Sequence, residues 1–206
     1  ETGTKLNIDN KYIMSPKDLC TIEFMDKIID AGVKVFKIEG RARSAEYVKK
    51  TAECYRRAAD AVCEGRYTPE LAASLKEELS EVFNRGFWDG YYQGAKLGEW
   101  SDVYGSHATR KKIYCGKITN WFDRISVAEV LVESEALRKG DDILIIGETT
   151  GVIEQNVSEI RVDLKPTDEA GKGTLCSIPV IFPDDIRTPG GKKIRRGDKV
   201  YIWKEV

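Results

Sequence analysis

The spacing of apolar residues changes near Lys111, and this change limits the folds open to the chain. Before it, apolar residues recur every three or four positions, as on the buried face of a helix. After it, they alternate with polar residues in short runs separated by glycine-bearing turns. We therefore predict an α/β region at 1–94, a linker at 95–110 and an all-β region at 111–206.

Two consecutive strand–loop–helix units are predicted at the start of the chain. An apolar run at 12–14 precedes a helix that ends at Gly32, and a second run at 33–38 precedes a helix that begins at Ser44. Strands joined by a helix through short links pair in parallel. The α/β region is therefore expected to be part of a parallel sheet.

Polar residues follow both predicted strands. In parallel sheets, polar groups after the carboxyl ends of the strands line the ligand site, so we expect one rim to carry the chemistry. The residues expected there are Lys17, Asp18 and Cys20 after the first strand, and Glu39, Arg41 and Arg43 after the second.

Two helices and an aromatic stretch complete the first region. A helix is predicted at 44–64, with Gly65 as its stop signal, and another from Thr68 to Gly86. The aromatic and glycine residues at 87–94 are interpreted as a compact turn rather than a platform for bases, because no Lys or Arg lies between them.

The all-β region is predicted to be a small antiparallel barrel or sandwich. Its expected strands are residues 112–118, 125–132, 142–146, 151–157, 160–164, 175–180 and 199–203.

One pattern occurs twice in this region, at 137–145 and 194–202. Each copy places a basic pair and a Gly-Asp turn before an apolar strand. Glycine tolerates a positive φ there, and Asp can hydrogen-bond the turn backbone. The basic pairs form either a solvated face or a phosphate-binding patch. They are Arg138 with Lys139 and Arg195 with Arg196.

Composition narrows the class of protein. The 206 residues carry 33 basic and 34 acidic side chains, so a strongly basic surface is excluded, and no run approaches the roughly 18 apolar residues of a membrane span. Five cysteines without a C-x-x-C pair indicate a reducing cytoplasm rather than a disulfide framework. The chain begins without methionine and holds too few βα units for a barrel of eight, so we expect the C-terminal part of a longer protein.

The run from Tyr12 to Cys20, Tyr-Ile-Met-Ser-Pro-Lys-Asp-Leu-Cys, and the run from Phe36 to Arg41, Phe-Lys-Ile-Glu-Gly-Arg, together resemble the collagenase-like peptidase family U32. The resemblance is nearest to the members that hydroxylate a tRNA uridine. It implies the last βα units of a TIM-type barrel, followed by a small antiparallel β-barrel domain.

The resemblance also implies a chemistry. Members that are better understood look like oxygen-independent hydroxylases of a tRNA uridine, an rRNA cytidine or ubiquinone precursors, and the RNA-directed members use prephenate as the hydroxyl source. Several carry a four-iron cluster on four cysteines, of which Cys20 matches the last. The other three would lie upstream, so we expect this chain alone to hold no cluster and to be inactive.

Each candidate residue has a structural alternative. Cys20 is either a cluster ligand, with its thiolate favoured by a helix N-terminus, or a packed loop thiol. Glu39 has either a functional role, in which it orients substrate or moves a proton, or a structural one, in which it forms an ion pair with Arg41 or Arg43. The two arginines are expected to hold a carboxylate or a phosphate. Asp18 is interpreted as a helix cap.

The remaining candidates are assigned to substrate binding. They are Lys17, Lys37, Arg138, Lys139, Arg195 and Arg196.

Three functions remain open at this point. The full-length parent is predicted to hydroxylate an RNA base, with tRNA or rRNA as its partner. The alternative is a collagenase-like peptidase, although a catalytic triad in this chain would need His107, the sole histidine, which lies in the predicted linker. The third is that 111–206 is an RNA-binding module. Unpaired strand edges also favour association with another chain, including a second copy.

Overall fold

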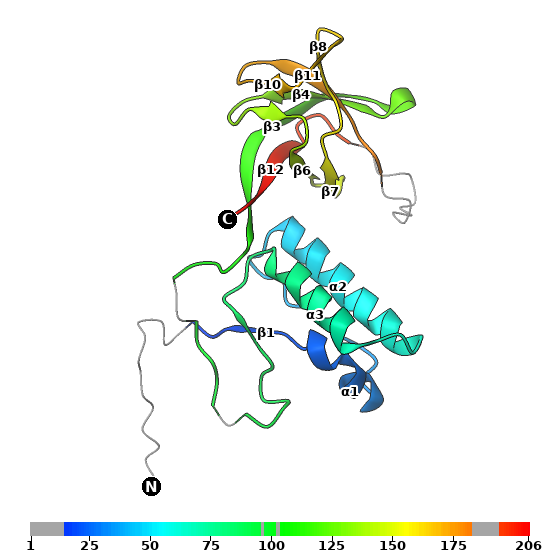
Figure 1. The fold of residues 1–206 in the computed structure, drawn as a ribbon, viewed down its shortest axis with the longest axis vertical. Coiled ribbons are helices and arrows are strands. Elements are labelled where there is room, and N and C mark those ends of the chain that lie inside the picture. The colour runs from blue at the N-terminus through cyan, green and yellow to red at the C-terminus, as the bar shows by residue number, and fades with distance from the viewer. Residues whose placement is uncertain (1–14, 96, 102–103, 183–193) are drawn as a thin grey trace. The chain divides into compact units, whose positions relative to one another are not determined.

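A computed structural model describes residues 15–95, 97–101, 104–182 and 194–206 (Figure 1). The chain divides into two compact units, residues 1–109 and residues 110–206. The strand predicted at 12–14 lies outside the described residues.

The N-terminal unit is built on two helices, α2 (Ala45–Cys63) and α3 (Pro69–Ser80), which pack side by side (Figure 1). A short 3₁₀ helix, η1 (Ile22–Phe24), and α1 (Met25–Asp30) lie against them. The apolar stripes of these helices meet in one core because residues three and four apart share a helix face. The buried members of that core are Cys20, Ile22, Met25, Cys54, Ala58, Leu75 and Leu79.

The ends of the two long helices follow the predicted signals in part. Thr68 caps α3, since its hydroxyl accepts a hydrogen bond of 3.2 Å from the amide of Leu71, and Gly65 after α2 has a φ of 68°. Ser44 stands at the N-cap of α2, but its side chain makes no cap hydrogen bond. The prediction that the second helix reaches Gly86 was wrong, because α3 ends at Ser80.

The strand predicted at 33–38 is not formed, so that prediction was wrong. Residues 33–40 have no sheet pairing, and Val35 is 84% exposed. A strand needs a hydrogen-bonded neighbour. The predicted neighbour at 12–14 lies outside the described residues, and the described strand that follows it, β1 (Asp18–Leu19), pairs in parallel with β2 (Phe87–Trp88). The described residues thus do not form the predicted βαβ unit, and the TIM-type barrel stays a prediction.

The C-terminal unit is an antiparallel sheet, as predicted. Eight strands follow the order β7-β6-β12-β3-β4-β11-β8-β9. A separate two-stranded sheet pairs β5 (Leu137–Arg138) with β10 (Glu169–Ala170). A 3₁₀ turn, η2 (Asp123–Ile125), joins β3 to β4. The bounds of the eight strands are β3 Arg110–Phe122, β4 Val127–Val132, β6 Asp142–Gly147, β7 Gly151–Asn156, β8 Ile160–Val162, β9 Lys165–Thr167, β11 Leu175–Pro179 and β12 Lys199–Glu205.

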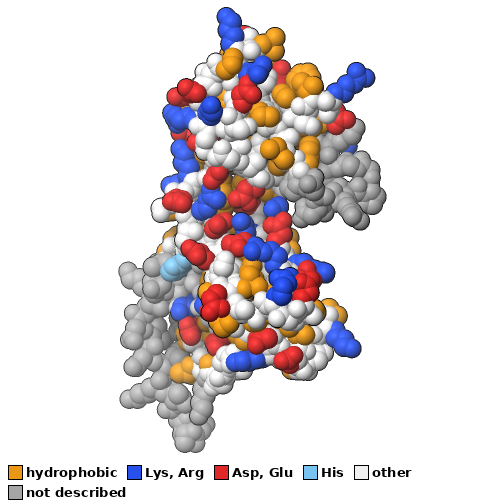
Figure 2. All heavy atoms as spheres, turned by 45° about the vertical axis from the view of Figure 1, so that its right-hand side comes forward, with side chains coloured by type: hydrophobic (Ala, Val, Ile, Leu, Met, Phe, Trp, Pro, Cys, Tyr) orange, Lys and Arg blue, Asp and Glu red, His pale blue; other side chains and the backbone are white. Residues whose placement is uncertain are grey.

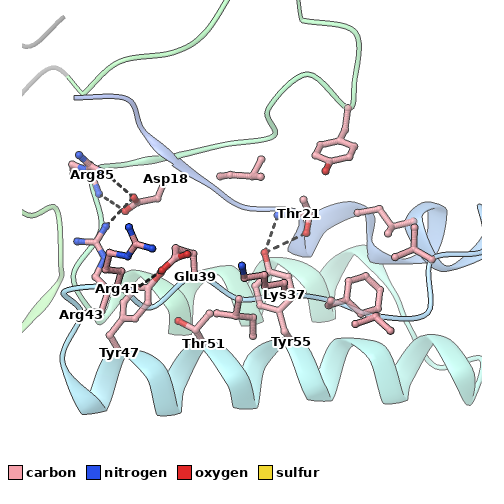
Figure 3. Close-up of a pocket in the computed structure, with 17 residues that line it drawn as sticks. Asp18, Thr21, Lys37, Glu39, Arg41, Arg43, Tyr47, Thr51, Tyr55 and Arg85 are labelled. Atoms are coloured by element: carbon pink, nitrogen blue, oxygen red, sulfur yellow. Dashed lines mark hydrogen bonds and ion pairs between the residues drawn. The ribbon is translucent and has the colours of Figure 1, made fainter. Parts of the chain in front are cut away.

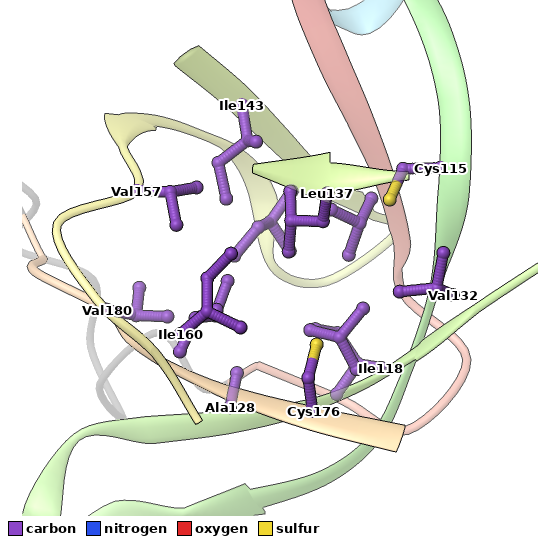
Figure 4. Close-up of a cluster of buried hydrophobic side chains, with 14 of the residues drawn as sticks. Cys115, Ile118, Ala128, Val132, Leu137, Ile143, Val157, Ile160, Cys176 and Val180 are labelled. Carbon is purple, nitrogen blue, oxygen red and sulfur yellow. The ribbon is translucent and has the colours of Figure 1, made fainter. Parts of the chain in front are cut away.

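The sheet curls around a single apolar core (Figure 4). Cys115 and Cys176 lie in this core as small buried side chains. The two end strands in the order, β7 and β9, do not pair with each other. A side chain of β7 instead closes part of the gap, because Gln155 donates to the carbonyl of Pro179 (2.9 Å) and accepts from the amide of Ile181 (3.0 Å).

The repeated Gly-Asp pattern forms two equivalent turns, as predicted. Gly140 and Gly197 have φ values of 90° and 93°. The carboxylate of Asp141 accepts from the amide of Arg138, and that of Asp198 from the amide of Arg195, each at 2.8 Å. Each turn leads into a strand, β6 or β12, and these two strands are antiparallel neighbours.

Acidic and basic side chains are interspersed over the visible face of the molecule (Figure 2). No helix within the described ranges is long and apolar enough to cross a membrane.

Candidate functional site

Asp18 is the centre of the candidate site (Figure 3). Pairing of β1 with β2 fixes its backbone, and its amide donates to the carbonyl of Gly86 at 2.8 Å. Its carboxylate accepts from the guanidinium of Arg43 (3.1 Å), from the guanidinium of Arg85 (3.4 Å) and from the amide of Arg85 (3.0 Å). The interpretation of Asp18 as a helix cap was therefore wrong, because it joins three separate segments of the chain.

Two aromatic rings hold Arg43 in position. Its guanidinium carbon lies 4.3 Å from the ring centroid of Phe83 and 5.3 Å from that of Tyr47. A planar guanidinium stacks well on aromatic faces, and the ion pair with Asp18 is largely shielded, with the two side chains 18% and 17% exposed. Arg43 is consequently oriented before any ligand arrives.

A cavity of about 550 Å³ opens beside this ion pair. Its lining contains four cationic side chains, those of Lys37, Arg41, Arg43 and Arg85, and only two carboxylates, those of Asp18 and Glu39. Glu39 accepts from the backbone amide of Arg41 at 2.8 Å rather than from a guanidinium. The excess of positive charge makes the cavity suited to an anion.

Apolar side chains, two threonines and three tyrosines line the rest of the cavity. The hydroxyl of Tyr55 accepts from the amide of Thr21 at 2.9 Å, and it donates to the sulfur of Cys20 at 3.8 Å. Burial raises the pKa of Tyr55, so this hydroxyl keeps its proton at neutral pH. It can therefore act as a hydrogen-bond donor or acceptor without adding charge.

Cys20 itself faces a different hollow, which it shares with Glu23, Lys76 and Trp88. The prediction that its sulfur shares one rim with the acid–arginine group is therefore not met. Its side chain is buried, and burial raises the pKa of the thiol, so the expectation of a favoured thiolate was wrong.

A four-iron cluster takes four thiolates, and the residues present do not fit one by themselves. Burial raises the pKa of the Cys20 thiol, and a tyrosine hydroxyl is the hydrogen-bond partner of its sulfur. Among the described residues, no group of three or more His, Cys, Asp and Glu side chains is placed to hold a metal ion.

The other candidates are dispersed. Lys17 forms an ion pair with Glu99 at 2.7 Å and does not line the cavity. Arg138 pairs with Glu169 at 3.0 Å, next to the exposed Lys139. Because β6 and β12 run antiparallel, the turns that carry the two basic pairs lie at opposite ends of these strands. The pairs therefore do not form one patch.

Sequence reasoning missed two residues of the site, Arg85 and Tyr55. Arg85 lies 67 positions from Asp18, just after α3, and no local motif marks it. Tyr55 belongs to the apolar stripe of α2, and its spacing there indicates packing alone. Its place opposite Thr21 follows from the tertiary packing of α1 and η1 on the long helices.

Residues 1–102 match the family model described as Peptidase family U32, and this segment contains every described residue of the cavity. The chain belongs to peptidase family U32. A protein named collagenase from Porphyromonas gingivalis is 52% identical over 201 residues, which cover 98% of this chain and 46% of that protein. A tRNA hydroxylation protein P from Haemophilus influenzae is 31% identical over 176 residues, which cover 85% of this chain and 37% of that protein.

An uncharacterized protease of Methanocaldococcus jannaschii is 36% identical over 200 residues, which cover 96% of this chain and 46% of that protein. The chain thus spans about half the length of the collagenases that it matches, with 46% and 53% covered.

Proposed function

We propose that the full-length protein hydroxylates a base of tRNA or rRNA, and that the cavity beside Asp18 binds an anionic group of its substrates. The observation that carries this proposal is the gathering of four cationic side chains around one cavity that has only two carboxylates. Relatives named tRNA hydroxylation protein, and one named 23S rRNA 5-hydroxycytidine C2501 synthase, support the choice of RNA.

Each residue of the cavity has a distinct part in this proposal. Arg43 presents a fixed guanidinium, and its planar donors match a carboxylate or phosphate by two parallel hydrogen bonds. Lys37 and Arg41 line the cavity without a side-chain ion pair in the described chain, so their charge is available to a ligand. Glu39, fixed by the Arg41 amide, is the group that accepts a hydrogen bond or a proton from the bound molecule.

Two ligands meet these requirements. A hydroxyl donor with two carboxylates, such as prephenate, places one carboxylate on Arg43 and the other on Arg41. An RNA phosphate takes the same donors. The three Tyr side chains of the lining, those of Tyr47, Tyr55 and Tyr92, supply rings against which a ligand ring can pack.

The proposal keeps Cys20 as one ligand of a four-iron cluster in the full-length protein, with three thiolates supplied from outside this chain. When bound, the cluster would supply redox chemistry. The test is iron content, since Cys20→Ser in the anaerobically purified full-length protein should lower bound iron, whereas Cys63→Ser at the exposed position of α2 should not.

The function is tested by nucleoside mass spectrometry. RNA is taken from cells that express the full-length protein with Arg41→Ala or Arg43→Ala, and Lys49→Ala on α2, outside the cavity lining, serves as the control. We expect the hydroxylated nucleoside with the parent and the control, and a reduction of at least tenfold with both cavity variants. Because Arg41 forms no ion pair within the described residues, its variant separates loss of function from loss of fold.

Peptidase activity is the competing outcome, given the relatives named collagenase. Gelatin cleavage by the full-length protein, together with an unchanged nucleoside profile, would overturn the proposal in favour of proteolysis.

A further inference from the structure

The second basic turn is docked against an irregularity in β3. The amide of Gly197 donates to the carbonyl of Ile118, and the amide of Ile118 donates to the carbonyl of Asp198, both at 2.8 Å. At the same place, the pairing of β3 with β4 shifts register between Ile118 and Asn120. A bulge of this kind redirects the side chains that follow it, and it is common beside binding sites.

The turn and the bulge together border a hollow of about 710 Å³. The indole of Trp121 lines it and packs edge-on against Phe182, with ring centroids 5.5 Å apart. Arg195 and Arg196 also line it. An aromatic ring and two guanidiniums therefore face one space.

In this hollow the acidic side chains have hydrogen-bond partners, whereas the two arginines form no ion pair among the described residues. Both of its carboxylates have partners, since Glu129 accepts from the hydroxyl of Thr119 at 2.6 Å and Asp123 accepts from the indole nitrogen of Trp121 at 3.2 Å. Within the described ranges, Arg195 and Arg196 are exposed and form no ion pair. Their cationic groups are left to solvent or to a ligand.

The first basic turn provides an internal comparison. It has the same hydrogen bond from the backbone of its first arginine to the aspartate of the turn, yet Arg138 pairs with Glu169 at 3.0 Å. The turn geometry alone thus does not explain why the second pair stays unpaired.

We propose that the hollow beside Trp121 binds a single-stranded segment of RNA, with Arg195 and Arg196 on successive phosphates and the indole against a base. Base stacking on an aromatic ring beside a cationic groove is the common mode for single strands. The choice of RNA rests on the proposed function.

The test uses the full chain and a fluorescein-labelled 12-nucleotide oligouridine, with affinity measured by anisotropy over a series of salt concentrations. We expect Arg195→Ala/Arg196→Ala to weaken binding by about tenfold. The slope of log K against log salt should also fall by about 1.4, because each phosphate that is no longer neutralised by an arginine lowers it by about 0.7. The matched control, Arg138→Ala/Lys139→Ala, removes the same charge and should change neither value appreciably.

Trp121 is tested by Trp121→Leu, which keeps an apolar side chain against the core, with circular dichroism to confirm the fold. We expect about tenfold weaker binding with an unchanged salt slope, because the variant removes stacking and keeps the charge. Equal effects of the two basic pairs on affinity, or equal competition by polyglutamate of the same length, would show a non-specific anion surface and overturn the proposal.

The two proposals can fail separately. If the full-length protein yields modified nucleosides but the oligouridine does not bind at Trp121, only the proposal of an RNA site in this hollow is overturned. If the oligouridine binds there but no nucleoside is modified, only the hydroxylase proposal is overturned.

Discussion

The guanidinium of Arg43 lies 3.1 Å from the carboxylate of Asp18, 25 residues earlier in the chain. This ion pair ties the segment before α2 to β1, and Arg85 ties the segment after α3 to the same carboxylate. The carboxylate of Asp18 thus connects three segments of the N-terminal unit at the edge of its cavity.

Asp18→Asn should destabilise the N-terminal unit by about 1–3 kcal/mol, because it removes a largely shielded carboxylate that accepts from charged donors. Urea unfolding followed by tryptophan fluorescence measures the change. The control is Glu53→Gln in the exposed Lys49–Glu53 pair of α2, where less than about 0.5 kcal/mol is expected. Equal effects from both variants would contradict the central position of Asp18.

The two helix N-termini should respond differently to the removal of a hydroxyl. Thr68→Ala should cost about 1 kcal/mol of unfolding free energy, because it removes the acceptor for the Leu71 amide. Ser44→Ala should cost less than half of that, since Ser44 makes no such bond. Thermal unfolding by circular dichroism at 222 nm measures both, and a larger effect of Ser44→Ala would refute the assignment.

Gly147 and Gly171 should differ when each is replaced by alanine. A Cβ at Gly147 would lie 2.0 Å from the carboxylate of Asp198, whereas a Cβ at Gly171 meets nothing within 4 Å. We expect Gly147→Ala to destabilise the C-terminal unit by about 1–3 kcal/mol or more. Gly171→Ala should be neutral or slightly stabilising. The midpoint of urea unfolding distinguishes the two.

The five thiols should show one fast and four slow reactions with a disulfide reagent at pH 8. Burial raises the pKa of Cys20, of Cys54 and Cys115 to about 12, and of Cys176 to about 11, while Cys63 is exposed. Only the thiolate reacts, and a raised pKa lowers its fraction at a given pH. Peptide mapping after brief labelling should place the label on Cys63, and early label on Cys20 would contradict the structure.

The same thiols predict a dependence of stability on alkaline pH. The pKa of Cys115 and Cys176 is higher in the folded state than the roughly 8.5 of a free thiol, so folding favours their protonated forms. Their contribution is complete below about pH 8.5 and is lost as the pH rises towards 11–12. Unfolding free energy should fall by about 1–2 kcal/mol per thiol between pH 8 and 10. Cys115→Ala/Cys176→Ala should flatten this dependence.

Local signals were enough to predict the features that depend on adjacent residues. The Gly-Asp turns, the Thr68 cap and most strands of the C-terminal unit follow from turn chemistry and from alternation with period two. The short strands β5, β9 and β10 were missed, because two or three residues hold too little of any period.

Features that depend on distant partners could not be predicted. Residues 33–38 alternate as a strand would, but alternation does not supply a neighbour for their backbone groups. The meeting of Asp18 with Arg85 depends on how the chain returns after α3. The grouping of Glu39, Arg41 and Arg43 around one cavity was expected, whereas the direction of the Cys20 sulfur depended on which strand pairs with β1.

The buried carboxylate of Asp198 accepts from the amide of Arg195 and, at 2.5 Å, from the hydroxyl of Thr150 in the turn just before β7. The loop between β6 and β7 and the turn that carries the two exposed arginines consequently share a single anchor. A displacement of that loop would therefore also move Asp198, 48 residues later in the chain. A substitution at Thr150 should therefore change the direction of the two arginines although neither arginine is itself substituted.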